Sequence, residues 1–238
     1  MTSKVSKEFN PGIGQTFYFI RTALYRKIKD FAPQMQGKML DFGCGSKPYQ
    51  SLFYNVKEYI GLDYDGEGHS HHNENIDVYY NGKVIPFENE YFDSIFSSEV
   101  FEHLFNIEEI LPELHRVLKT KGKILVTCPF VWNEHEVPVD FARYTRFALK
   151  SMMEKNGFEV LVQDKSGDYL SALYQMRVQY VANYLLPAIP VLGKRKFFVT
   201  NLRPIIVLIM NAWFSVWHKI LPKPNDLYLN NILLAEKK

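Results

Sequence analysis

Only two cysteines, Cys44 and Cys128, occur among the 238 residues of the chain. Two cysteines cannot form the disulfide framework that stabilises small secreted proteins, so a reducing, cytoplasmic location is expected. A signal-peptide pattern is also lacking, because the apolar segment at residues 12–31 is broken by Gln15 and Arg21 and has no small-residue cleavage site. We predict instead that residues 16–31 form an amphipathic surface helix.

Low-complexity tracts and internal repeats are absent as well, and the composition of 47% hydrophobic and 23% charged residues is that of a folded protein. Between residues 37 and 164, short β-branched and aromatic runs alternate with segments of helical periodicity. This alternation predicts an α/β fold with a parallel sheet and right-handed crossovers. The predicted strands are Met39–Phe42, Tyr59–Leu62, Ile76–Tyr79, Phe92–Ser97 and Lys123–Thr127. Thr145 is expected to cap a helix that stops at Gly157.

A glycine turn follows the first predicted strand, with Gly43 and Gly45 just behind Asp41. Glycine lets the backbone approach a ligand that a Cβ atom would block, and ligands of open parallel sheets bind at the carboxyl ends of the strands. A dinucleotide fingerprint needs a third glycine where this chain has Pro48, and a carboxylate is unfavourable beside phosphates. S-adenosylmethionine carries an ammonium and a sulfonium group and no phosphate, so the turn favours this cofactor.

The second predicted strand ends at Asp63, which lies 18 residues after Gly45. A carboxylate at a strand end can accept hydrogen bonds from both hydroxyls of a ribose. An aspartate in this position is also a common turn former, so the glycine turn gives this prediction most of its weight.

Four segments occur together in the order and spacing of a known family: "LDFGCGSKPY", "YIGLDYD", "IPFENEYFDSIFSSEVFEHL" and "LHRVLKTKGKILVTCPF". Together they resemble the class I S-adenosylmethionine-dependent methyltransferases of the type 11 domain, over roughly residues 37–164. The resemblance implies a Rossmann-like sheet of seven strands in the order 3-2-1-4-5-7-6, with the last strand antiparallel and helices on its faces. It implies four regions: an N-terminal tail and helix (1–35), the cofactor-binding core (36–166), a helical insertion (167–226) and the final strand (227–238).

The resemblance also implies roles for single residues. Asp41, Gly43 and Gly45 would line the methionine part of the cofactor, and Asp63 would bind its ribose. The remaining implied cofactor contacts are Asn81, in place of the usual acidic adenine contact, and Ser98 and Glu99, which would face the amino-acid end.

The loop after the fifth predicted strand carries the candidates for the chemistry. A hydroxyl acceptor needs a general base, and we predict His135 in this role, oriented by Glu136 or Asp140. Arg143 could hold a phosphate or carboxylate of the substrate. The segment "HEVPVDFARYT" is similar to a block in type 11 enzymes linked to bacterial surface-polysaccharide synthesis. The alternative is a rigid lid closed by pairing of Arg143 with Asp140 and Glu136, and His103 is a minor second candidate.

The segment "GEGHSHHNEN" gathers His69, His71 and His72, but its spacing fits no standard metal site. We predict a solvated loop there and assign no metal.

Charge is distributed unevenly along the chain. From residue 170 onward there are nine Lys or Arg and two Asp or Glu, a net charge of +7, whereas the whole chain carries +2. Residues 167–226 also hold two apolar stretches, but only 15 residues separate Arg203 from Lys219, fewer than the roughly 20 of a transmembrane helix. With Trp213 and Trp217 nearby, we predict contact with an anionic membrane surface on the inner face of the plasma membrane. A helical cap or a homodimer interface is the alternative.

These observations predict an S-adenosylmethionine-dependent methyltransferase, EC class 2.1.1, that O-methylates a sugar of a lipid-linked or surface-polysaccharide precursor. One alternative keeps the fold with a quinone-like or other lipophilic small-molecule acceptor. Another is a non-catalytic, membrane-tethered assembly protein. Nucleic acid is an unexpected partner, because no basic-aromatic groove or nucleobase-methylating motif is present.

Overall fold

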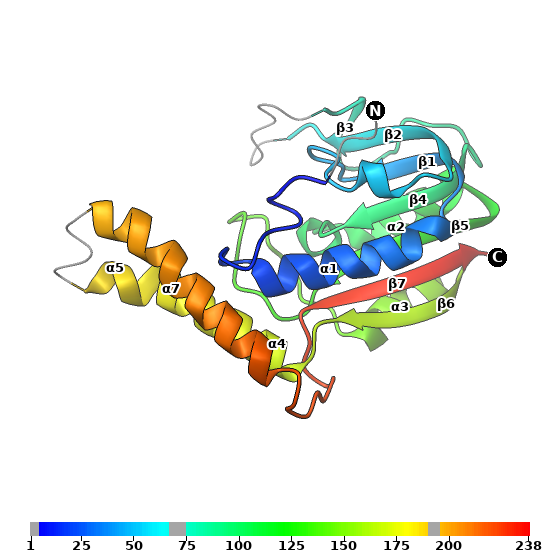
Figure 1. The fold of residues 1–238 in the computed structure, drawn as a ribbon. Coiled ribbons are helices and arrows are strands. Elements are labelled where there is room, and N and C mark those ends of the chain that lie inside the picture. Colours follow the sequence, from blue (N-terminus) through cyan, green and yellow to red (C-terminus); the bar gives the residue numbers. More distant parts are fainter. Residues whose placement is uncertain (1–4, 67–74, 190–195) are drawn as a thin grey trace. The chain divides into compact units, whose positions relative to one another are not determined.

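In the computed structural model, the described residues are 5–66, 75–189 and 196–238. Seven strands form one sheet in the order β3-β2-β1-β4-β5-β7-β6 (Figure 1). The strands are β1 (Gly37–Phe42), β2 (Val56–Tyr64), β3 (Val78–Tyr80), β4 (Phe92–Ser98), β5 (Leu118–Pro129), β6 (Phe158–Ser166) and β7 (Asn230–Lys237). The parallel pairs are β1–β2, β1–β4, β2–β3 and β4–β5, whereas β7 runs antiparallel to β5. The predicted strand order and the antiparallel last strand are therefore confirmed.

The fifth strand is longer than its sequence pattern predicted. It begins at Leu118 rather than Lys123, and Leu118 pairs with Phe92 ahead of a shift in register. Alternating lysines and Gly122 hide this first part of the strand, because they carry no apolar signal. The third strand, Val78–Tyr80, begins two residues later than predicted.

The main core lies between the sheet and two helices, α2 (Ile107–Val117) and α3 (Arg146–Lys155), which lie on one face of it (Figure 1). The buried positions of α2 follow the helical repeat, so one face of the helix is apolar. They are Ile107, Ile110, Leu111, Leu114 and Val117. Thr145 caps α3, as predicted, by accepting a hydrogen bond from the Ala148 backbone N–H at 3.2 Å, and Gly157 follows with a φ of +85°.

The chain divides into two compact units. Residues 27–164 and 230–238 form the first unit, and residues 5–26 and 165–229 form the second. Helix α1 (Tyr18–Phe31), which confirms the helix predicted at residues 16–31, begins in the second unit and ends in the first.

The second unit is built around two helices that lie side by side, α4 (Tyr169–Tyr180) and α7 (Lys196–Trp217) (Figure 1). The π-helix η4 (Val181–Leu185) and the short α5 (Leu186–Ala188) continue α4. Between α4 and α7, the rings of Tyr174 and Phe214 stack with their centroids 4.0 Å apart, beside the buried Val178 and Val207.

Buried polar side chains fasten the N-terminal segment to this helix pair. Asn211 donates to the backbone carbonyls of Ile13 and Gln15 at 2.7 and 3.1 Å, and Gln175 donates to that of Thr16 at 2.8 Å. Such bonds satisfy backbone groups that lie outside regular structure. The N-terminal segment and the predicted insertion thus share one unit. None of the helices among the described residues combines the length and the apolar character needed to cross a membrane.

Candidate active site

A cavity of about 480 Å³ lies at the carboxyl ends of the parallel strands in the first unit. The glycine turn after β1 and the residues that follow β2, β3 and β4 form its wall, together with part of the loop after β5. Its polar lining includes Asp63, Asn81, Glu99, His103 and Glu136. The carboxyl-end position is where open α/β sheets bind ligands.

Both glycines of the turn are required by the local geometry. Gly43 has a φ of +72°, and a Cβ atom there would lie 2.3 Å from a methyl carbon of Val100. Gly45 has a φ of +45°, and its backbone N–H donates to Asp63 Oδ2 at 2.7 Å. Glycine adopts such left-handed backbone conformations with little steric penalty because it has no Cβ atom. The turn can therefore pack tightly against the wall of the cavity.

The segment after the glycine turn is tied to the start of the third strand by an ion pair between the buried Lys47 and the exposed Asp77. Lys47 Nζ lies 2.5 Å from Asp77 Oδ2, and the Gly61 backbone N–H donates to the same oxygen at 2.7 Å. Burial would raise the pKa of Asp77, but these hydrogen bonds and the charge of Lys47 hold it below its usual value. The paired carboxylate fixes the neighbouring strand ends that shape the cavity.

Two predicted cofactor contacts, Asp63 and Asn81, lie on the cavity wall, and the side-chain oxygens of both already accept hydrogen bonds from the backbone. Asp63 accepts from the N–H groups of Gly45 and Tyr64. Asn81 Oδ1 accepts from those of Lys83 and Val84, at 3.0 and 3.2 Å. Both side chains are therefore held in position by local backbone, which preorganises them for a ligand. Their roles in binding ribose and adenine stay predictions.

Asp41 is in a different environment from the other predicted contacts. Its side chain is buried and accepts a hydrogen bond from the Tyr59 hydroxyl, while the next residue, Phe42, lines the cavity. Successive side chains of a strand point to opposite faces, which accounts for this difference. Burial raises the pKa of Asp41 to about 7, although the hydrogen bond from Tyr59 acts in the opposite direction. Its contact with the methionine part stays a prediction.

The two residues predicted after β4 are connected to β5 and β7. Ser98 Oγ lies 2.9 Å from Thr127 Oγ1, and Glu99 accepts from Thr127 at 2.9 Å and from Asn230 at 2.7 Å. Glu99 lines the cavity and has a φ of +58°. A non-glycine residue in this conformation is unusual and persists only where its surroundings hold it, as the two hydrogen bonds to its carboxylate do here.

The loop after β5, residues 130–145, is packed onto the short helix η3 (Phe101–His103) through backbone atoms. The Phe141 and Ala142 N–H groups both donate to the Glu102 carbonyl, at 2.8 and 3.2 Å. At the far end, Asn231 donates to the Tyr144 carbonyl at 2.8 Å. These contacts bring His135 to His103, with ring centroids 4.8 Å apart.

Three of the four predicted catalytic residues form one network. Arg143 donates two hydrogen bonds to Asp140, at 2.5 and 2.7 Å, and Asp140 Oδ2 lies 3.2 Å from His135 Nδ1. The hydrogen bonds from Arg143 lower the pKa of Asp140 to about 2. Burial, with a smaller contribution from His103, lowers the pKa of His135 below its usual value, although Asp140 acts in the opposite direction. His135 is therefore neutral near pH 7 and can accept a proton.

Arg143 and Glu136 are placed differently from each other. The guanidinium of Arg143 also donates to the carbonyls of Ala142 and Asn133, so its position is fixed by the loop. Glu136 lines the cavity, has a φ of +50° and places its carboxylate 3.5 Å from His103 Nε2. The Arg143–Asp140 pair of the lid alternative is thus present, and a catalytic role for His135 stays a prediction.

Glu102 is a buried carboxyl group that sequence analysis did not select. It is fully buried, and neither of its oxygens has a hydrogen-bond partner among the described residues. Burial, followed by the charge of Glu99, raises the pKa of Glu102 well above its usual value. The only signal in the sequence is its place beside His103 in "EVFEHL", which is equally compatible with a solvent-exposed helix. The histidines of "GEGHSHHNEN" lie outside the described residues.

Comparison with known proteins finds a resemblance over part of the first unit. Residues 40–126 match a family model described as a methyltransferase domain. The chain has a methyltransferase fold. The matched range includes the glycine turn, Asp63, Asn81 and Glu99, all of which line the cavity. This match supports S-adenosylmethionine as the cofactor. No curated protein matches the sequence.

Solved structures share this fold at low sequence identity. An S-adenosylmethionine-dependent methyltransferase from Mesorhizobium loti superposes with a TM-score of 0.53 at 11% identity, covering 95% of this chain and 100% of that chain. The 4+2 cyclase SpnF gives 0.57 at 16% identity, covering 96% and 86%. Phosphoethanolamine N-methyltransferase 2 from Haemonchus contortus gives 0.50 at 16% identity, covering 96% and 60%. Because the similar structures include a cyclase as well as methyltransferases, the fold alone does not decide the reaction or the acceptor.

Proposed function

We propose that the protein is an S-adenosylmethionine-dependent methyltransferase that methylates a hydroxyl group of a sugar. The observation that carries the proposal is the composition of one cavity. Its cofactor side is formed by the glycine turn, Asp63 and Asn81, and its other side presents the imidazole of His103 and the carboxylate of Glu136. Bound S-adenosylmethionine would supply the methyl group as a sulfonium electrophile. The protein then needs to align an acceptor, exclude water and remove a proton.

The loop after β5 provides groups for the last two tasks. Phe141 from this loop and Phe105 line the cavity with ring centroids 5.3 Å apart, and their apolar surface would exclude water once an acceptor covers it. His135 is the proposed base, because its imidazole is neutral at pH 7 and Asp140 lies against Nδ1. In this arrangement Asp140 would stabilise the imidazolium that forms when the hydroxyl proton is taken.

Two measurements on the purified full chain test this proposal. Calorimetry with S-adenosylmethionine and S-adenosylhomocysteine should show one site per chain. Incubation with methyl-labelled cofactor should place label on nucleotide-linked or polyprenyl-phosphate-linked sugars, detected by mass spectrometry. Label on a quinone-like acceptor and on no sugar would replace the proposed acceptor class. An absence of cofactor binding would favour the non-catalytic alternative.

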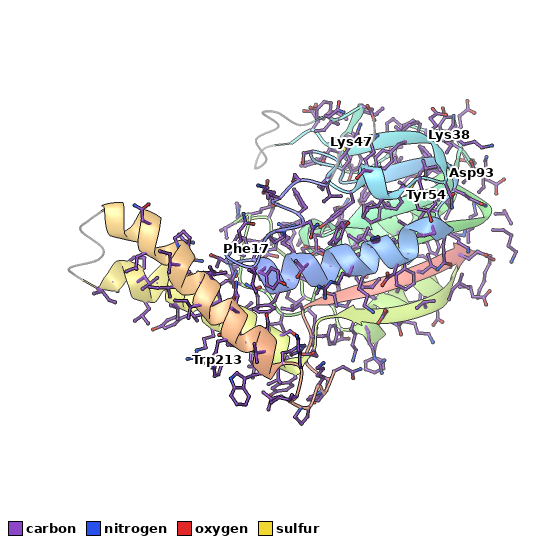
Figure 2. The ribbon with its side chains drawn as sticks, in the orientation of Figure 1. Phe17, Lys38, Lys47, Tyr54, Asp93 and Trp213 are labelled. Carbon is purple, nitrogen blue, oxygen red and sulfur yellow. The ribbon has the colours of Figure 1, made fainter. Side chains whose placement is uncertain are left out.

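A lipid-linked acceptor is proposed because the second unit carries an exposed apolar surface. On α7, Ile205, Ile209 and Trp213 recur every four residues on the solvent side, and Trp213 is 55% exposed and projects from the helix (Figure 2). The opposite side of α7, which includes Phe214, packs on α4. The aromatic and aliphatic side chains are exposed, the net charge from residue 170 onward is +7, and no helix among the described residues spans a membrane. This combination is typical of a helix pair that lies on an anionic membrane.

Sedimentation with vesicles tests this part of the proposal. The wild type should sediment with anionic vesicles, and added salt should release it only in part, because salt screens the ionic attraction but not the apolar one. The predicted basic run covers residues 194–196, of which 194 and 195 lie outside the described residues and Lys196 begins α7. Replacement of all three by serines should weaken binding. Ile209→Ser with Trp213→Ser should weaken it further, whereas Phe147→Ser, an exposed side chain of the first unit, should not. If the protein is a soluble dimer that does not sediment with vesicles, the exposed apolar surface is the contact with a second copy of the chain.

A further inference from the structure

We propose that Glu102, His103 and His135 bind a divalent transition-metal cation beside the cavity. One possible ligand atom from each of these residues lies within 4.8 Å of those of the other two. His103 Nε2 is 3.8 Å from Glu102 Oε1 and 3.5 Å from Glu136 Oε2, so a second carboxylate lies at the same point. Ligands of a zinc-like ion, each about 2.1 Å from the metal, lie roughly 3–3.5 Å from one another. Small side-chain rotations would close the observed distances to these values.

The hydrogen bonds of His103 prepare it as a metal ligand. Its Nδ1 lies 2.8 Å from the Val139 backbone carbonyl, which can only accept a hydrogen bond. The proton of the neutral ring must therefore be on Nδ1, and the lone pair is on Nε2, the nitrogen next to the carboxylates of Glu102 and Glu136. Metal-binding histidines are commonly oriented by this bond from the other ring nitrogen to a carbonyl.

Glu102 gives the second, independent indication of a ligand. Both Glu102 oxygens are buried and accept no hydrogen bond from the described residues. Such a carboxylate costs several kcal/mol, so native proteins pair such groups or use them to bind metal ions. A proton alone would remove the charge but would leave both oxygens without a hydrogen bond among the described residues. A cation between Glu102 and the two imidazoles would satisfy the carboxylate and offset its charge.

The charges around the cluster favour a cation as well. Glu99, Glu102 and Glu136 surround it, and the nearby Asp140 is already paired with Arg143. Two imidazoles with carboxylates suit first-row ions such as Mn²⁺, Fe²⁺, Co²⁺ or Zn²⁺ better than Mg²⁺ or Ca²⁺, which prefer oxygen alone. Because His103 and Glu136 line the cavity, one coordination position would face an acceptor hydroxyl and could lower its pKa. This role in methyl transfer rests on the proposed function, whereas metal binding itself does not. With one ring nitrogen on the metal and the other against Asp140, His135 would have no lone pair for the hydroxyl proton, so the metal would replace it as the group that activates the acceptor.

Cobalt binding to the full chain tests the site directly, because Co²⁺ absorbs visible light when bound to nitrogen and oxygen ligands. The experiment uses chelator-treated protein in which His69, His71 and His72 are replaced by serine, so that these histidines cannot contribute. We expect one Co²⁺ per chain and an affinity at least tenfold lower after Glu102→Gln or His103→Gln. His115→Gln, a half-buried histidine outside the cluster, is the matched control and should bind as before.

A melting experiment gives a second readout that does not depend on activity. A hundredfold excess of Co²⁺ over its dissociation constant should raise the melting temperature by about 5–10 °C, and Glu102→Gln should abolish this rise. If Glu102→Gln does not fold by circular dichroism, His103→Gln decides the result. Unchanged Co²⁺ affinity in the variants, loss of binding on removal of the three loop histidines, or no saturable binding up to millimolar Co²⁺ would each overturn the proposal. Cofactor calorimetry on the same samples separates this failure from failure of the proposed function.

Discussion

Asp63 combines two tasks, since it holds the glycine turn through Gly45 and faces the cavity. Asp63→Ala should weaken S-adenosylmethionine binding by about 1–3 kcal/mol, which is roughly 5- to 150-fold, because charge-assisted hydrogen bonds are lost. Calorimetry measures the change directly. Asp65→Ala, an exposed carboxylate two residues later, is the control and should bind the cofactor normally. If both variants bind S-adenosylmethionine equally well, Asp63 does not bind the ribose of the cofactor.

His135 is the residue on which the chemistry of the proposed function depends most. His135→Ala should lower turnover about 10²-fold or more with cofactor affinity intact, as the loss of a general base does. The readout is transfer of labelled methyl groups under saturating cofactor. Glu134→Ala changes the adjacent exposed residue and should stay near wild-type turnover. A loss of only a few-fold at His135 would favour the rigid lid.

Among the elements of the fold, the turn after β1 is the most sensitive to a single methyl group. Gly43→Ala adds a Cβ atom 2.3 Å from a Val100 methyl carbon at a φ of +72°, so we expect a loss of about 1–3 kcal/mol in stability and at least tenfold weaker cofactor binding. Urea unfolding and calorimetry measure the two effects. Gly12→Ala, with no atom within 4 Å of the added methyl, is the control.

A double variant separates the two causes of this loss. Val100→Ala should recover part of the stability of Gly43→Ala by removing the clash, whereas the strained backbone would remain. The two effects couple because the residues are in contact. If Gly43→Ala is as stable as Gly12→Ala, the turn is not the rigid feature described above.

The elements of the sheet could largely be predicted from the sequence, and their exact extents could not. Strand and helix signals alternate locally, so their order follows from the chain. The first part of β5 escaped prediction because Leu118 is held by pairing with Phe92, a contact between residues far apart in sequence. The cap at Thr145 was predictable because it depends on residues within one turn.

The candidate site divides in the same way. The glycine turn and Asp63 could be predicted because each lies at a strand end, where its position follows from local sequence. Glu102 could not, since its burial arises when the loop after β5 docks on its carbonyl through Phe141 and Ala142. The approach of His135 to His103 has the same origin, so the sequence does not reveal the cluster.

The stability of the whole molecule should depend on pH through Asp41. Its pKa is raised from 3.8 to about 7, so between these values the folded protein keeps a proton that the unfolded chain releases. The stabilisation is complete below pH 4 and is lost as pH rises to about 7. Asp41→Asn has no carboxyl group to ionise and should not lose this stabilisation as pH rises. The free energy of unfolding of the variant minus that of the wild type should therefore increase by about 3 kcal/mol from pH 5 to pH 8.

Urea unfolding at several pH values tests this expectation. Asp30→Asn, at an exposed position, is the matched control and should keep the wild-type pH profile. A constant difference between wild type and Asp41→Asn across this range would mean that the carboxyl group is ionised in the folded protein at pH 5.

The position of β7 between β5 and β6 has a consequence for synthesis on the ribosome. Residues 165–229 are translated after most of β6 and before β7, so the first unit lacks an inner strand while they are made. At about 5–20 residues per second, these 65 residues take roughly 3–13 s. Throughout this interval the edge of β5 that will receive β7 is open to pairing with other chains. The nascent polypeptide, rather than the finished protein, is therefore the form most in need of chaperone protection.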